Sequence, residues 1–228
     1  MKETTNVPLK SQQREIPDAA YWETLRRAYY AAKERCSYQD EEFQEYDEEL
    51  KEVFENKGYS GAATEFAIQY GDFGRGLFAT RDIKQGQVVW TCEREGVFCT
   101  KAEWRLFLSL LPHHMQYDVV TWAYVMEWDE DTGEQVVGLD LEPSALLNHG
   151  GSDISKLDDT IDPSNIKPAN LECIKVPDTE DDWQYLAATD IKSGDELLCD
   201  YSKFHVYDNK LQWWQDDWET IVEKENYY

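Results

Sequence analysis

The chain has 228 residues, a length that fits one domain with an appendage or two small domains. Hydrophobic residues make up 41% of it and aromatic residues 14%, which is too much core-forming material for a disordered chain. The formal net charge of −25 disfavours duplex nucleic acid and membrane surfaces as partners, because phosphate groups repel an acidic protein. The charge instead favours a basic protein or peptide as partner.

The start of the chain and its cysteines indicate the cellular compartment. Residues 1–16 are polar and are expected to form a flexible leader, and no run of the sequence is long and apolar enough for a membrane span. We therefore expect neither a signal peptide nor a transmembrane segment. The five cysteines form no CxxC pair and combine with no histidine at zinc-ligand spacing, so no metal site is expected. Reduced, buried thiols are typical of an intracellular protein, nuclear or cytoplasmic.

Two helices are predicted near the N-terminus. Apolar residues recur every three or four positions after Pro17, which is suited to the first turn of a helix. A second helix is predicted over residues 41–56, with Gly58 beyond its end. Its polar face is strongly acidic and is either a solvated surface or a docking surface for a basic partner. The apolar faces hold Trp22, Leu25, Ala28, Tyr29 and Ala32 in the first helix, and Phe43, Tyr46, Leu50, Val53 and Phe54 in the second.

The middle of the chain is predicted to be rich in short strands. Brief apolar or alternating runs are separated there by glycine, aspartate and asparagine. Helical segments are expected at residues 101–111 and 143–147, and the polar residues 150–170 form a long loop. A closing helix is predicted over residues 208–225. The strands are expected at residues 64–69, 76–80, 88–91, 136–141, 171–176 and 185–188.

Three segments far apart in the sequence suggest one ligand site. The first is GDFGRGLFATRDIKQG, where Gly74 and Gly76 flank Arg75 and leave the backbone open to a ligand. The second is LLNHG, in which Asn148 and His149 can present two side chains to one ligand. Considered alone, this pair is more often a capped helix end with a satisfied histidine.

The third segment is ATDIKSGDELLCDY, which ends in an Asp-Tyr pair at Tyr201. Its opening repeats part of the first segment, because TDIKSG at residues 189–194 echoes TRDIKQG at residues 80–86. Each segment by itself is weak evidence for a function. Their combination and order are more specific.

Together the three segments resemble the SET domain of protein-lysine methyltransferases over roughly residues 64–205. GRGLFATRDIKQGQVV looks like the glycine motif of that family, LLNHG like its Asn-His-Ser-Cys motif and GDELLCDYS like its Glu-Leu…Asp-Tyr motif. The resemblance implies a mainly β fold with helical additions (α+β), the β-clip of SET domains, with the second and third motifs threaded into a pseudoknot. We expect a leader with acidic N-terminal helices at 1–61, the SET domain at 62–205 and a C-terminal helix closing the site at 206–228.

The resemblance also implies a cofactor and roles for individual residues. S-adenosylmethionine would lie on one face, and a lysine of the protein substrate would enter through a channel from the other. Gly74, Arg75 and Gly76 would line the cofactor with main-chain groups, and Asn148 and His149 would hold its adenine and amino acid end. Tyr201 would be catalytic, with its hydroxyl close to the transferring methyl group. The lysine must lose a proton first, and a desolvated channel would lower its usual pKa of about 10.4.

The sequence departs from the family pattern after the Asn-His pair. Gly150 and Gly151 stand where serine and cysteine are usual, which predicts a looser loop. The asparagine that normally follows soon afterwards could be Asn165 or Asn170, and the sequence leaves both open.

Further departures concern the substrate channel. Cys199 stands where an aromatic residue often precedes the catalytic tyrosine, and its small side chain would leave room for higher methylation states. The cysteine-rich flanks of many histone methyltransferases are absent. Phe204, Tyr207 and the tryptophan-rich last helix would close the site instead.

Three functional hypotheses follow from these residues. The first is a lysine methyltransferase that acts on a histone or another basic protein. The second is a degenerate SET module that binds a basic partner without transferring a methyl group. The third assigns the function to the acidic helix alone. The sequence leaves the oligomeric state open.

Overall fold

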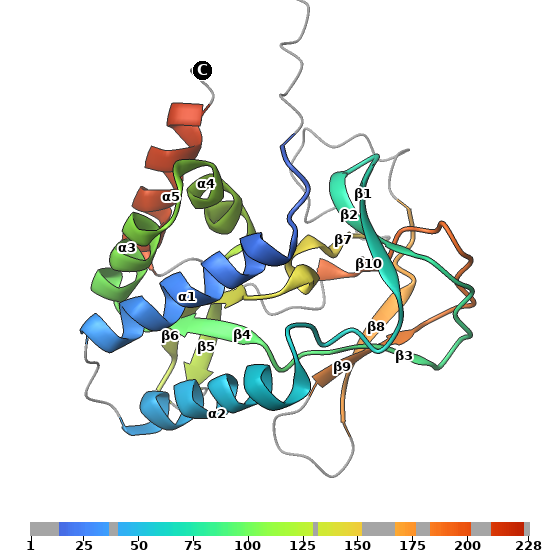
Figure 1. Cartoon of the computed structure of the whole chain (residues 1–228), viewed down its shortest axis with the longest axis horizontal. Helices are drawn as coiled ribbons and strands as arrows, with labels where there is room; N and C mark the ends of the chain where they lie inside the picture. The colour runs from blue at the N-terminus through green and yellow to red at the C-terminus, as the bar shows by residue number, and fades with distance from the viewer. Residues whose placement is uncertain are drawn as a thin grey trace, which may run out of the picture.

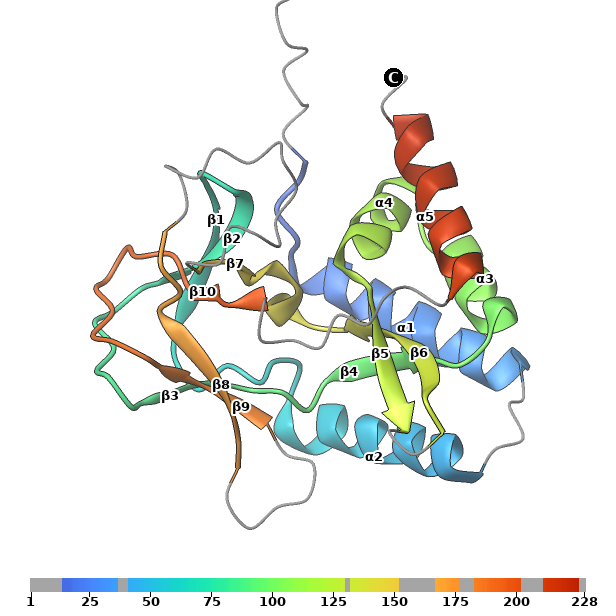
Figure 2. The same ribbon diagram turned by 180° about the vertical axis from the view of Figure 1, so that it is seen from behind.

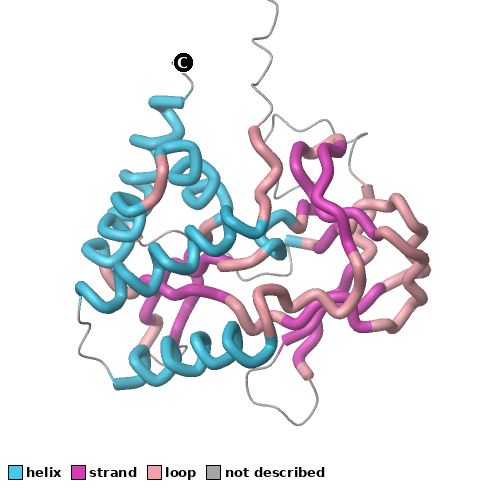
Figure 3. Tube along the Cα trace, viewed as in Figure 1, coloured by secondary structure: helices cyan, strands magenta, loops and turns pink. Residues whose placement is uncertain are grey.

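Helices gather on one side of the molecule and most of the strands on the other (Figure 3). The computed structural model describes residues 14–36, 41–129, 132–151, 167–176, 183–201 and 211–225. None of the helices in these ranges is long and apolar enough to cross a membrane. The helices are α1 (Ala19–Cys36), α2 (Glu41–Lys57), α3 (Lys101–Leu110), α4 (His113–Trp122), α5 (Gln212–Glu225) and the 3-10 helix η1 (Pro143–Leu146).

The described strands form four small sheets, none of which closes into a barrel. Three sheets are antiparallel, and the fourth is a parallel pair. This arrangement confirms the predicted α+β class. The sheets are β1 (Phe66–Gly71) with β2 (Gly74–Ala79); β3 (Val88–Thr91), β9 (Trp183–Ala187) and β8 (Leu171–Lys175); β4 (Glu95–Phe98), β6 (Glu134–Asp140) and β5 (Tyr124–Asp129); and β7 (Asn148–His149) with β10 (Leu198–Cys199).

The sheet β4–β6–β5 lies between the two N-terminal helices (Figure 1). Successive side chains of a strand point to opposite faces, so β4 packs against α1 on one face and against α2 on the other. Phe98 packs edge-on against Tyr29 of α1, with ring centroids 5.3 Å apart. Its neighbour Val97 packs with Phe43 of α2 in a second apolar cluster. The N-terminal helices therefore share the core of the strand-rich region.

The periodic pattern located both helices correctly. The residues buried in α1 are the five predicted for its apolar face. Helix α2 ends at Lys57, one residue later than expected, and Phe43 and Leu50 are its buried anchors. The sequence missed α4, a short helix that contains two adjacent β-branched residues, Val119 and Val120. It also missed strands β4 and β5 and the two-residue strands β7 and β10.

The two echoing segments pack against each other reciprocally. Ile83 and Ile191 exchange backbone hydrogen bonds, both 2.9 Å long. Lys84 pairs with Asp190 at 2.8 Å, and Lys192 pairs with Asp82 at 2.9 Å. These exposed ion pairs stabilise the fold little, so the backbone pairing is the main bond between the segments. It brings the chain after β2 next to the chain before β10.

Helix α5 packs against the other helices, and its placement is clearest from behind (Figure 2). Arg105 of α3 forms a two-pronged ion pair with Asp217, with the shortest N–O distance 2.6 Å. Trp214 is buried and belongs to the main core, while Trp218 stays 38% exposed. Helix α5 thus lies beside α3 and α4.

Candidate functional site

The three segments that carry the motifs meet at Asn148. The Asn148 side-chain nitrogen donates to the Arg75 carbonyl oxygen at 3.0 Å and to Glu196 Oε1 at 2.9 Å. Asn148 also pairs in parallel with Leu198 of β10. Leu197 donates to the Leu77 carbonyl at 2.7 Å, which ties the third segment to the first. The fold therefore assembles the predicted constellation from residues more than 100 positions apart.

The two glycines beside Arg75 do different work. Gly74 has a φ of +96° and starts β2 after a two-residue hairpin, and a side chain there would meet nothing within 4 Å. A Cβ at Gly76 would lie 2.8 Å from Asn148 Nδ2 and would overlap the Glu196 carboxylate. Gly74 thus permits the turn, and Gly76 permits close packing of the three segments.

Arg75 points its side chain away from Asn148 and into the helices. Its guanidinium forms a two-pronged ion pair with Asp118 of α4, with distances of 2.6 and 3.0 Å. Its Nη1 also donates to the Glu15 carbonyl at 3.0 Å, and the guanidinium lies over the Trp122 ring. Only the main chain of Arg75 faces the motif residues, in line with the main-chain role expected from the sequence.

His149 and Tyr201 form the second half of the site. The Tyr201 backbone N–H donates to His149 Nδ1 at 3.0 Å, so the ring proton is assigned to Nε2. His149 Nε2 is buried and has no hydrogen-bond partner among the described residues. The Tyr201 hydroxyl donates to the Leu147 carbonyl at 2.5 Å, while the residue as a whole is 43% exposed. Desolvation of that hydroxyl raises the pKa of Tyr201.

Sequence reasoning gave no role to Glu196 in this cluster and left the choice between Asn165 and Asn170 open. Glu196 is 5% exposed, and its Oε2 has no hydrogen-bond partner in the described part of the chain. Asn170 donates to the Glu196 carbonyl at 2.7 Å and accepts from the Leu198 N–H at 2.9 Å. Asn170 therefore lies at the site, while Asn165 lies outside the described residues. The available signal for Glu196 was a charged residue directly before an apolar strand.

The glycines after His149 are tightly packed, which contradicts the predicted looser loop. Gly150 is buried and donates to the Cys199 carbonyl at 2.8 Å. A Cβ on Gly150 would lie 2.7 Å from the Leu198 Cβ and 3.0 Å from Ala169. Glycine is needed here because two backbones approach closely.

One of the three predicted channel residues falls within the described chain. Cys199 is 2% exposed, its Sγ lies 3.9 Å from the Asn148 carbonyl oxygen, and burial raises the pKa of its thiol. Cys199 is therefore part of the buried packing where β10 pairs with β7. Phe204 and Tyr207 lie outside the described residues.

The residues present fit part of the expected cofactor-binding role. His149 offers a buried N–H donor, which suits a ligand that brings hydrogen-bond acceptors. Gly74 leaves open space where a side chain would stand. The Asn148 nitrogen is already used within the protein, so Asn148 would contact a cofactor through its other polar atoms.

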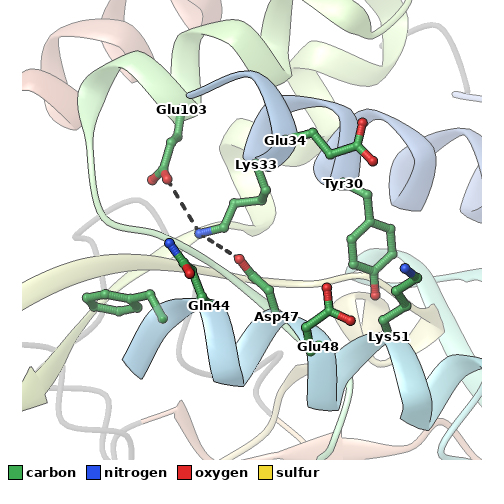
Figure 4. A pocket seen from close by; sticks show the side chains of 9 residues that line it. Tyr30, Lys33, Glu34, Gln44, Asp47, Glu48, Lys51 and Glu103 are labelled. Carbon is green, nitrogen blue, oxygen red and sulfur yellow. Dashed lines mark ion pairs between the residues drawn. The ribbon is translucent and has the colours of Figure 1, made fainter. Parts of the chain in front are cut away.

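A separate cavity of about 450 Å³ lies between α1 and α2 (Figure 4). Lys33 is nearly buried there and lies 3.3 Å from Asp47 and 3.5 Å from Glu103. The three side chains link α1, α2 and α3. None of the described residues that line this cavity belongs to the three motif segments. We assign the cavity a structural ion cluster and place the candidate site elsewhere.

Three carboxyl groups have raised pKa values at and just after the sheet β4–β6–β5: Glu142 is buried, and Glu95 and Asp140 are partly buried. Burial raises the pKa of Glu95 to about 7, of Asp140 to about 6 and of Glu142 to about 7. Glu142 accepts hydrogen bonds from Trp90 Nε1 at 3.0 Å and from the Gly61 N–H at 2.5 Å, which only partly offsets its burial.

We expect the protein to become more stable as the pH falls from 8 to 5. A carboxyl group whose folded-state pKa is raised binds its proton first in the folded state, so stability is lost as pH rises through that pKa. Each pKa lies two units or more above its ordinary value, so each group contributes up to about 3 kcal/mol, at about 1.4 kcal/mol for one pKa unit. Urea unfolding at pH 8, 7, 6 and 5 measures this dependence. Glu95→Gln should flatten it, and a wild-type stability that falls with acidification over this range would contradict it.

Comparison with known proteins gives a family match. Residues 74–202 match the SET domain. No curated protein matches the sequence significantly.

Several solved structures are similar to this chain. The Neurospora SET domain protein DIM-5, a histone lysine methyltransferase, is 20% identical over 66% of this chain and 56% of its own, with a TM-score of 0.37. CpSET8 from Cryptosporidium is 15% identical over 74% of this chain and 69% of its own, with a TM-score of 0.38. ctPRC2 in an autoinhibited conformation bound to S-adenosylmethionine is 18% identical over 72% of this chain, with a TM-score of 0.41. The chain spans only 17% of that ctPRC2 chain.

Proposed function

Since the chain belongs to the SET-domain family, we propose that it is a protein-lysine N-methyltransferase that uses S-adenosylmethionine. The observation that carries the proposal is the junction at Asn148, where its amide joins the first and third motifs. The backbone N–H of Tyr201 donates to His149, the residue next to Asn148, so Tyr201 belongs to the same cluster. The proposal thus depends on three ordered motifs and on their contacts in one cluster.

The residues of the cluster would share the work of binding and orientation. When bound, S-adenosylmethionine supplies a methyl group on a positively charged sulfur. The backbone at Gly74 and the Nε2–H of His149 would bind the cofactor. Asn148 would hold the first and third motifs in position through its two hydrogen bonds. Gly76 would allow this close approach of the motifs because it has no side chain.

Tyr201 would orient the substrate amine and exclude water from it. Its hydroxyl is held by the Leu147 carbonyl, and its partly exposed ring can cover an incoming side chain. Methyl transfer needs a neutral amine in line with the bond that breaks, and positioning of this kind supplies much of the rate. Desolvation next to a sulfonium favours the neutral amine.

The substrate would be a basic protein, of which a histone tail is one example. A net charge of −25 attracts lysine-rich chains over a distance and speeds their encounter with the protein. Such substrates are intracellular, which agrees with a nuclear or cytoplasmic location.

A second candidate is a SET module that binds a basic partner without catalysis. The observation that favours it is that the side chains of Arg75 and Asn148 both have partners within the protein. An internally satisfied cluster can be kept for fold stability alone.

Titration calorimetry with S-adenosylmethionine and S-adenosylhomocysteine distinguishes the methyltransferase from the non-catalytic binding module. We expect saturable binding of both, and we expect Asn148→Ala to weaken it at least about tenfold, since two hydrogen bonds that hold the motifs are lost. Asn56→Ala is the matched control, because Asn56 is exposed at the end of α2. A folded protein that binds neither ligand at millimolar concentration would contradict the enzyme proposal and favour the binding module.

A further inference from the structure

Two cavities follow one another between helices α1 and α2. The first has a volume of about 450 Å³ and the second of about 410 Å³, and Tyr30 and Lys51 line both of them. Their lining on α1 runs from Glu23 to Glu34, which is about 17 Å along the helix axis. The two cavities therefore form one groove, the α1–α2 groove, which is long enough for about five residues of an extended peptide.

The floor of the first cavity is an ion cluster whose ammonium group is already in use. Lys33 Nζ lies 3.3 Å from an Asp47 oxygen and 3.5 Å from a Glu103 oxygen (Figure 4). The same nitrogen donates a hydrogen bond to the Val97 carbonyl at 3.1 Å. The positive charge of Lys33 is thus held within the protein, which makes this cavity a poor site for an anion.

Negative charge is in excess around the first cavity. Four carboxylates and two ammonium groups line it, which gives the lining a formal charge of −2. Glu34 and Glu48 are exposed at its rim and form no ion pair with any residue in the described ranges. Glu103 is fully buried, and its Oε1 accepts no hydrogen bond from the described part of the chain. Hydrogen-bond donors on a cationic ligand would stabilise these oxygens.

Uncharged groups of the same cavity also suit an organic cation. The Tyr30 hydroxyl is buried and has no hydrogen-bond partner among the described residues, and it can accept a hydrogen bond as well as donate one. Phe43 and Tyr30 add two aromatic rings to the lining. Aromatic rings attract a cation that comes close to their faces.

An arginine side chain combines the properties that this cavity favours. Its guanidinium is planar, carries five N–H donors and stacks on aromatic rings. No described group of three histidine, cysteine, aspartate or glutamate side chains is arranged to hold a metal ion instead. The net charge of −25 attracts basic segments to the protein. We infer that the α1–α2 groove docks an arginine-bearing segment of a basic partner protein, with the arginine side chain in the first cavity.

This docking groove is separate from the motif cluster. None of the residues that line either cavity belongs to the three motif segments. A partner held at the groove keeps its other segments at a raised local concentration near Tyr201. The inference does not rest on the proposed function, because a methyltransferase and a non-catalytic module would both gain affinity for a basic partner.

The first test is calorimetry with the full-length protein and an acetylated Gly-Arg-Gly-Arg-Gly peptide. We expect saturable binding that weakens at least about tenfold when citrulline, a neutral side chain of the same shape, replaces arginine. Lysine in place of arginine should also weaken binding, because lysine lacks the planar fork of donors. Absence of binding at millimolar peptide, or equal binding of the citrulline peptide, would overturn the inference. Equal binding of the lysine peptide would overturn the assignment to arginine.

The second test places the peptide in the groove. Glu34→Gln combined with Glu48→Gln should weaken binding of the arginine peptide at least about tenfold. Glu45→Gln combined with Glu49→Gln is the matched control, since it removes two exposed acids of α2 that line neither cavity. We expect the control to stay within about twofold of the wild type.

Equal weakening in the two double variants would overturn the inference, because the peptide would then be attracted by the acidic surface in general. All four substituted residues are exposed, so both variants should fold as the wild type does. Neither titration involves S-adenosylmethionine, so the result does not depend on whether the protein transfers a methyl group.

Discussion

Replacing Tyr201 with phenylalanine is expected to lower the rate of methyl transfer at least about 100-fold. The hydroxyl that the substitution removes is the one held by the Leu147 carbonyl. Loss of one polar group that is fixed in advance at a reacting centre typically lowers kcat by about 10²–10³. Transfer of a labelled methyl group to histone-tail peptides measures the rate. Cofactor affinity should change less than about twofold, since the backbone bond from Tyr201 to His149 remains.

Tyr70→Phe is the matched control for this substitution. Tyr70 is also partly exposed, and its hydroxyl donates to the backbone carbonyl of Arg14. Tyr70 lies on β1. Loss of the Tyr70 hydroxyl should therefore leave the rate of methyl transfer unchanged. A Tyr201→Phe protein that keeps its full rate would contradict the catalytic role of Tyr201. Retained binding of a basic partner by that variant, without any wild-type activity, would instead favour the binding module.

Gly76→Ala is expected to destabilise the protein by about 2–3 kcal/mol and to weaken cofactor binding at least about tenfold. The new methyl group would overlap the Glu196 carboxylate and press on Asn148, so the three motif segments must move apart. Urea unfolding measures the free energy of unfolding, and calorimetry measures the affinity for S-adenosylhomocysteine.

Gly58→Ala provides the comparison, because Gly58 lies outside the three motif segments and a Cβ there would meet no atom within 4 Å. Its positive φ of +81° makes alanine strained by about 1–2 kcal/mol, without any clash at the junction. We expect reduced stability with cofactor affinity close to that of the wild type. Equal losses of affinity in both variants would contradict the assignment of close packing to Gly76 alone.

The sequence predicted the features that depend on local pattern. The buried face of α1 followed from a three- and four-residue apolar spacing, and the observed helix buries those same residues. The meeting of the motifs followed from a family resemblance, and the contacts of Asn148 join two of them directly. The roles of Gly74, Arg75, Gly76, Asn148, His149 and Tyr201 in binding and catalysis stay predictions, as does the division of the chain at residues 61 and 205.

Features set by distant contacts could not be read from the sequence. Glu196, Glu95 and Asp140 look like ordinary surface acids in an acidic chain, and only the tertiary structure buries Glu196 and partly buries the other two. Gly150 was predicted to loosen a loop. In the structure a glycine is required there because the segment about fifty residues later in the chain packs directly against it. Strand β4 begins with a charged residue and a glycine, so its two apolar residues alone were too short a run to predict a strand.

The parallel pairing of β7 with β10 also has a kinetic consequence. Asn148 and Leu198 are neighbours in space although fifty residues separate them, and Arg75 joins them from still further away. Loops of that length close slowly, and contacts of high sequence separation slow folding to the range of milliseconds to seconds. Helix α1 can form early because its contacts within the helix are local. The binding cluster needs the last described strand in place, so it exists only after the rest of the molecule has assembled. A partly synthesised or C-terminally shortened chain would therefore hold much of the fold and none of the site.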